Sequence, residues 1–94
     1  MRNPKPPKPP KGWLDLRSHM CKYIGKRLRY IAEHGQTHPH DMTYALWVEA
    51  LLKHGTVLLY HGTQDGKGMA DDDSFAAAKE SLHWVADNLA DLWD

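Results

Sequence analysis

The stretch His34–Asp41, HGQTHPHD, places three histidines and one aspartate within eight residues. Imidazole nitrogens and carboxylate oxygens are the ligand types that zinc and similar divalent metals take from proteins. The stretch therefore raises the hypothesis of a metal site. Its candidate ligands are His34, His38, His40 and Asp41.

The ends of two helices explain the same residues without a metal. His34 falls in the last turn of a predicted helix, where a cation suits the helix dipole, and Gly35 stands where a glycine commonly ends a helix. Thr37 or Asp41 is of the type that caps the next helix, and Pro39 fixes the entry of the chain. We therefore interpret the stretch as a connector, and we predict no metal or other cofactor.

The dipeptide His40-Asp41 is also similar to the signature of HD phosphohydrolases, which use a further histidine and a distant aspartate on facing helices. His19 and Asp65 are left to fill those roles. HD domains are normally longer, and the chain has no Walker phosphate loop, nucleophile elbow or His-Glu-x-x-His pair. We predict that the protein is not an enzyme, and a small metal-dependent hydrolase is the least favoured of the three functions weighed.

A second stretch, KYIGKRLRY from Lys22 to Tyr30, alternates cations and aromatic rings along one predicted helical surface. Phosphates bind Lys and Arg, and bases stack on flat rings and guanidinium planes. The alternative is that these residues only form the polar outer side of a bundle helix, with tyrosines covering its rim. The candidate ligand-binding residues are Lys22, Tyr23, Lys26, Arg27, Arg29 and Tyr30.

The charges of the chain are divided although its net charge is zero. Residues 1–35 carry nine Lys and Arg against two acids, and residues 36–94 carry three Lys against ten acids. The first third thus has a charge of +7 and the remainder −7. This asymmetry predicts an anionic partner for the first third, or a basic surface that the acidic one neutralises within the fold or in a head-to-tail assembly.

Three helical segments are predicted to position these residues. Apolar residues recur every three or four positions over residues 13–34, 41–61 and 72–92, with a loop at 62–72 between the last two segments. Gly55 interrupts the middle segment and permits a strand at TVLLY, but no second strand is available for pairing, so we predict one helix closely packed at Gly55. The predicted fold is all-α, a three-helix antiparallel bundle.

The flanks and the composition set further limits. Residues 1–12, MRNPKPPKPPKG, predict a disordered, basic, Pro-rich tail before a single helical domain at 13–94. Cys21 is the only cysteine, so no intramolecular disulfide forms. The chain lacks an apolar run of roughly 20 residues, so we predict a soluble, cytoplasmic protein that does not enter the membrane. Four Trp and four Tyr in 94 residues favour a homo-oligomer.

The central segment DMTYALWVEALLKHGTVLLYHG resembles the helical-hairpin domain of phage anti-defence sponge proteins, which sequester cyclic-nucleotide immune signals. The likeness covers about a quarter of the chain and rests on Asp41, Tyr44, Leu52, Gly55 and Leu59. It implies no binding residue here, because Thr43 stands where a basic residue is expected, the usual Gln near the glycine is absent, and the third helix is additional.

Together these observations predict a small non-catalytic protein that acts by stoichiometric binding or sequestration. Its partner is another protein or a nucleotide-like ligand, and a phage-encoded inhibitor of host defence is the concrete form that the resemblance implies. The alternative is a nucleic-acid-binding accessory protein that uses the basic tail and the same helix face.

Overall fold

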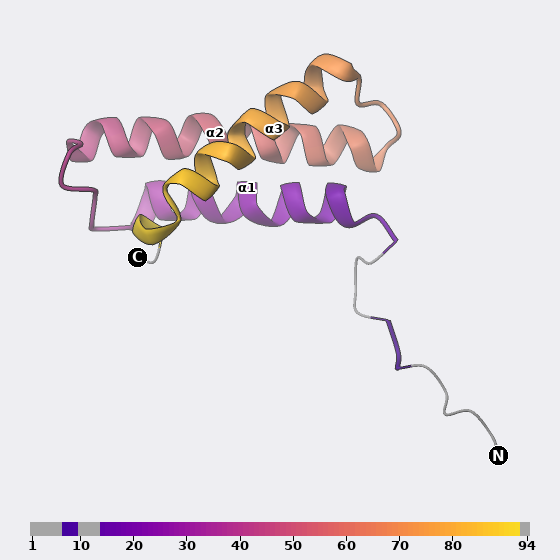
Figure 1. Cartoon of the computed structure of the whole chain (residues 1–94), viewed down its shortest axis with the longest axis horizontal. Helices are drawn as coiled ribbons and strands as arrows, with labels where there is room; N and C mark the ends of the chain where they lie inside the picture. Colours follow the sequence, from indigo (N-terminus) through magenta and orange to yellow (C-terminus); the bar gives the residue numbers. More distant parts are fainter. Residues whose placement is uncertain (1–6, 10–13, 93–94) are drawn as a thin grey trace.

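The computed structural model describes residues 7–9 and 14–92. It contains the helices α1 (Leu16–His34), α2 (Tyr44–Gly66) and α3 (Asp72–Asp87), followed by the short 3-10 helix η1 (Leu89–Asp91). Within the described residues there is no strand. The prediction of an all-α, three-helix antiparallel bundle is confirmed (Figure 1). Of the predicted tail, residues 1–6 and 10–12 lie outside the described residues, as does Trp13, and residues 7–9 are exposed without regular structure.

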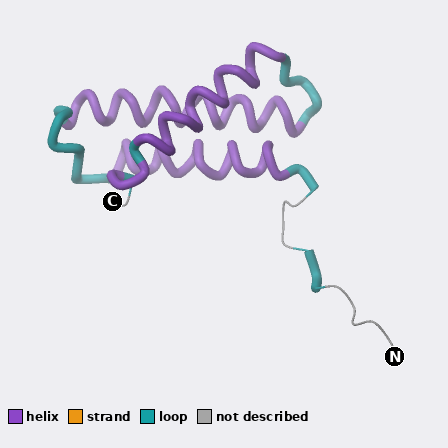
Figure 2. Tube along the Cα trace, viewed as in Figure 1, coloured by secondary structure: helices purple, strands orange, loops and turns teal. Residues whose placement is uncertain are grey.

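Helices α1 and α2 lie antiparallel and are joined by one connection, with α3 crossing them obliquely (Figure 2). The buried positions of α1 follow a spacing of 3, 4, 3 and 4, which is the heptad pattern of closely paired helices. They are Ser18, Cys21, Gly25, Leu28 and Ala32. The predicted apolar stripe of α1 is therefore only partly correct. Leu16 is 64% exposed, whereas Leu28 and the smaller residues Ser18, Cys21, Gly25 and Ala32 are buried.

Three glycines set how closely the two helices approach. A Cβ added at Gly25 would lie 2.6 Å from the backbone nitrogen of Leu59 and 2.7 Å from the carbonyl oxygen of Gly55. At Gly62 the added atom would lie 2.8 Å from the carbonyl oxygen of Ser18. These distances leave no room for any side chain. The prediction of one continuous central helix that packs closely at Gly55 is confirmed, and TVLLY is not a strand.

The connection between α1 and α2 differs in detail from its prediction. Gly35 does end α1, and its N–H donates to the carbonyl oxygen of Ile31 at 2.7 Å, but its backbone is extended rather than left-handed. The N-cap of α2 is Thr43, whose hydroxyl accepts from the N–H of Leu46 at 3.2 Å. Neither Thr37 nor Asp41 caps this helix, because α2 begins later than the predicted residue 41.

The connection between α2 and α3 is shorter than predicted. Helix α2 continues past Gly62 to Gly66, because Gly62 is needed for close packing on α1 and does not terminate the helix. The chain then turns at Gly68, whose φ of 72° is a conformation that glycine adopts readily. Asp71 caps α3 by accepting from the N–H of Ser74 at 2.9 Å.

Helix α3 covers one face of the α1/α2 pair through Ala78 and Ser81, which are both buried. The predicted third segment extended to residue 92, but the α-helix ends at Asp87, and Leu89 in the following 3-10 turn is 68% exposed. The core contains residues of all three helices, with Trp47, Leu51 and Leu58 of α2 fully enclosed. Helix α2 packs against both α1 and α3. None of the described helices is both long and apolar enough for a membrane crossing.

Candidate functional site

The six residues predicted to bind a ligand lie on the exposed side of α1, and we call them the basic face. Gly25 and the other buried residues of α1 face α2. The residues of the basic face occupy the remaining positions of the helix and therefore lie on its outer side. Two adjoining hollows follow this side of the helix. The first, of about 410 Å³, is lined by His19, Lys22, Tyr23, Lys26 and Arg27. The second, of about 200 Å³, is lined by Lys26, Arg29, Tyr30, Glu33 and Leu59.

All six predicted residues thus line one or the other hollow, and Lys26 lines both. The sequence identified this set by its alternation of cations and rings. It did not identify Leu59, which α2 contributes to the second hollow, or Glu33, which adds one negative charge there. Contacts between helices set such neighbours, and the spacing within a single helix does not reveal them.

Both tyrosine rings of the basic face are held from one side by their own helix. The guanidinium carbon of Arg27 lies 3.4 Å from the centre of the Tyr23 ring, and Arg27 also donates to the carbonyl oxygen of Tyr23 at 3.3 Å. The rings of Tyr30 and His34 stack with their centres 4.1 Å apart. Each tyrosine nevertheless remains more than half exposed. The arrangement fixes two rings and leaves each of them surface on which a flat group can stack.

The cations of the basic face form no ion pair with another described residue. The only ion pair among the described residues joins Arg17 to Asp65, and neither belongs to this face. The side-chain stems of two cations pack over glycines of α2. A Cβ at Gly62 would lie 2.7 Å from Cγ of Lys22, and one at Gly55 would lie 2.9 Å from Cγ of Arg29. The stems of Lys22 and Arg29 therefore pack over the same glycines that allow α1 and α2 to approach closely.

No family model, curated protein or solved structure matches this chain. The likeness of the central segment to phage sponge proteins therefore stays a prediction.

Two histidines of HGQTHPHD make separate contacts with other residues. His34 stacks on Tyr30, and Nδ1 of His38 lies 2.9 Å from the carbonyl oxygen of Pro39. Within residues 7–9 and 14–92, no group of three or more His, Cys, Asp or Glu side chains is arranged to hold a metal ion. Asp65, the distant aspartate of the hydrolase hypothesis, instead accepts from Nε of Arg17 at 2.8 Å.

Two histidine–serine pairs, one buried and one partly buried, were not predicted from the sequence. Nδ1 of His54 lies 2.9 Å from the Ser81 hydroxyl, and Nδ1 of His61 lies 2.6 Å from the Ser74 hydroxyl. The signal was present, because both the histidines of α2 and the serines of α3 are seven residues apart. Both histidines and Ser81 are buried, and each histidine joins α2 to a serine of α3, so these pairs act in the fold.

Proposed function

We propose that this protein is a non-catalytic binding protein that holds a phosphate-bearing, nucleotide-like ligand on the basic face of α1. The observation that carries the proposal is the pair of adjoining hollows, which together present four cations without ion-pair partners among the described residues and two exposed tyrosine rings. Cations bind phosphate oxygens and the rings provide surfaces for bases. Such binding is stoichiometric, because the protein holds the ligand and does not convert it.

The shape of the face favours a ligand with two base-phosphate units. Tyr23 and Tyr30 are seven residues apart, which places them about 10 Å apart along the helix axis. Each hollow has its own tyrosine and its own cations, and Lys26 lies between them. A dinucleotide places a base in each hollow and its phosphates along Lys26. Sequestration of a cyclic dinucleotide signal in the host cytoplasm, by a phage-encoded inhibitor that forms a homo-oligomer, is the concrete form we propose.

A second candidate is an accessory protein for single-stranded nucleic acid. The observation that favours it is that both hollows lie at the surface along α1, which leaves room for a strand to continue beyond the basic face. The Pro- and Lys-rich residues 1–12 then add further phosphate contacts. The two candidates differ in how affinity depends on ligand length and salt. A strand that spans several cations loses affinity steeply as salt rises, whereas a dinucleotide with two phosphates loses much less.

Calorimetric titration with a cyclic dinucleotide and with a single strand of about 16 nucleotides, each at low and high salt, tests the proposal. We expect the dinucleotide to bind, with Lys26→Glu weakening its affinity at least about tenfold because Lys26 lines both hollows. Lys53→Glu makes the same charge change at an exposed position of α2 outside both hollows, and it should leave the affinity unchanged. Binding of the single strand alone supports the second candidate. If neither ligand binds, or if both variants act equally, the basic face is not the site.

A further inference from the structure

An apolar wedge lies between the three helices, apart from the basic face. Helix α3 runs obliquely across the α1/α2 pair, and its first turn lies toward the end of α2 (Figure 1). The wedge between the helices has a volume of about 220 Å³. Its apolar walls are formed by Met20 and Cys21 of α1 and by Phe75, Ala78 and Leu82 of α3.

The polar groups of the inner wall are already engaged in the fold. His61 bonds to Ser74 through Nδ1 and meets the edge of the Phe75 ring. Burial raises the pKa of the Cys21 thiol, with a further contribution from the nearby Asp65, so the thiol is neutral at pH 7. The interior therefore suits an apolar group that requires no hydrogen bond.

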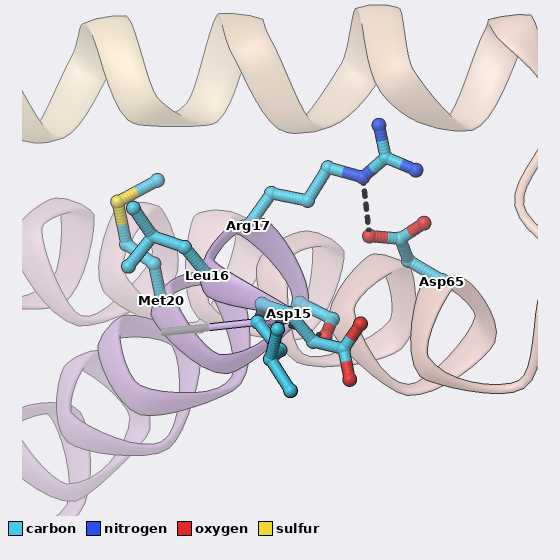
Figure 3. Close-up of a pocket in the computed structure, with 7 residues that line it drawn as sticks. Asp15, Leu16, Arg17, Met20 and Asp65 are labelled. Carbon is cyan, nitrogen blue, oxygen red and sulfur yellow. Dashed lines mark hydrogen bonds and ion pairs between the residues drawn. The ribbon is translucent and has the colours of Figure 1, made fainter. Parts of the chain in front are cut away.

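Charge is distributed unequally around the opening. Arg17 stacks on Phe75 at 4.7 Å and its charge is compensated by Asp65, with which it forms an ion pair (Figure 3). Lys79 lies one helical turn beyond Phe75, is exposed, and makes no ion pair within the described residues. One side of the opening thus presents a compensated pair, and the other presents an uncompensated cation.

A larger hollow of about 430 Å³ continues from the wedge across Arg17 and Met20, which line both spaces. Figure 3 shows the side chains of Leu16 and Met20 beside each other in this hollow. Its two acids, Asp15 and Asp65, repel an anion. An anionic head group is therefore favoured at Lys79, with its apolar chain directed toward Met20 and Leu16.

We propose that the wedge binds a small amphipathic anion, a medium-chain carboxylate, with its chain between α1 and α3 and its carboxylate at Lys79. The wedge is smaller than the roughly 300–1,000 Å³ of drug-sized pockets, so the buried part of the chain is short and the rest lies over the adjoining hollow. This site is independent of the basic face, which shares none of its lining residues.

Calorimetric titration of the full chain with decanoate, decanol and decyltrimethylammonium tests the head-group requirement. We expect decanoate to bind about tenfold more tightly than decanol, and the cation to bind least. Lys79→Glu should abolish the preference for decanoate over decanol, whereas Lys53→Glu, with the same charge change outside the wedge, should preserve it. No binding of decanoate, or an unchanged preference in Lys79→Glu, overturns the proposal.

The position of the ligand is tested at Ala78, which lines the wedge. Ala78→Leu fills the wedge and should abolish decanoate binding while circular dichroism stays helical. If this variant unfolds, the Lys79→Glu comparison still decides. Full decanoate binding by a folded Ala78→Leu protein places the ligand elsewhere and overturns the proposal.

Discussion

Nδ1 of His54 and the hydroxyl of Ser81 lie 2.9 Å apart in a buried contact between α2 and α3. The imidazole also stacks on Trp84, with ring centres 4.5 Å apart and planes inclined by 17°. One heptad away, His61 and Ser74 repeat the pair at 2.6 Å. Helix α3 is thus fixed on α2 by two polar contacts set among apolar ones. Each buried imidazole has a hydroxyl partner, which offsets the cost of removing it from water.

Ser81→Ala should destabilise the fold by about 1–3 kcal/mol, because it leaves the buried His54 nitrogen without its partner. Urea denaturation followed by circular dichroism measures this loss. Thr56→Ala is the control, since it removes an exposed hydroxyl from α2 and puts a better helix former in its place. Equal stability of the Ser81→Ala and wild-type proteins would show that the buried pair contributes nothing net.

The fold should lose stability as the pH falls below about 6.5, and His54 should account for part of this loss. Burial lowers the pKa of His54 from its usual 6.5, and Lys53 lowers it further, whereas Glu80 of α3 acts in the opposite direction. Between the folded pKa and 6.5 the unfolded chain binds more protons at this site, so the free energy of unfolding rises with pH through that window. Below the folded pKa the contribution is lost.

Urea midpoints measured between about pH 8 and pH 5 test this prediction. His54→Gln removes the titrating group and should reduce the pH dependence. The substitution also changes the contacts of residue 54 with Ser81 and Trp84 at every pH. The two proteins are therefore compared by how steeply their stability changes with pH, and not by their absolute stability. Identical slopes in the two proteins would contradict the assigned role of His54.

Helix number and type followed from the sequence because the apolar periodicity of each segment is a local property. The faces through which the helices contact each other did not follow from the sequence, and α1 illustrates the reason. Its large apolar residues Leu16 and Met20 fit a helical stripe, yet the contact with α2 is made by smaller residues such as Ser18 and Gly25. Periodicity measures hydrophobicity and gives no weight to residues that contribute by being small. The tight approach of two helices depends on size, which the pattern did not reveal.

Gly25→Ala should destabilise the protein although alanine is the better helix former. The added Cβ would meet the backbone of Leu59 at 2.6 Å and that of Gly55 at 2.7 Å, and neither backbone atom can move without separating α1 from α2. We expect the overpacking cost of about 1–3 kcal/mol or more to exceed the gain in helix propensity of about 1 kcal/mol. Thermal unfolding followed by circular dichroism measures the difference.

Gly66→Ala provides the control for this substitution. Its added Cβ would meet only Nζ of Lys22, at 3.9 Å, which is an ordinary contact with the end of a flexible side chain. This variant should be neutral or slightly stabilised. A stabilised Gly25→Ala protein would mean that α1 and α2 separate at little cost.

The basic face was predictable because all its residues lie on one helix, whereas the wedge was not. The alternation in KYIGKRLRY sets which side chains share a surface, independently of tertiary contacts. The wedge instead depends on the oblique course of α3, which brings Cys21, His61 and Phe75 together from three helices. No spacing within one helix encodes that crossing.

Tyr30→Ala should weaken binding of the cyclic dinucleotide if the basic face acts as proposed. Stacking of a base on an aromatic side chain contributes about 1–3 kcal/mol, so the dissociation constant should rise roughly 5- to 150-fold. Tyr30→Phe keeps the ring and should bind almost as well as the wild type, which separates stacking from hydrogen bonding. Tyr60→Ala is the control, because Tyr60 is as exposed as Tyr30, at 63%, but lies on α2 outside both hollows. Calorimetry on the four proteins decides, and an equal loss in Tyr30→Ala and Tyr60→Ala would mean that exposed aromatic surface in general, rather than the basic face, holds the ligand.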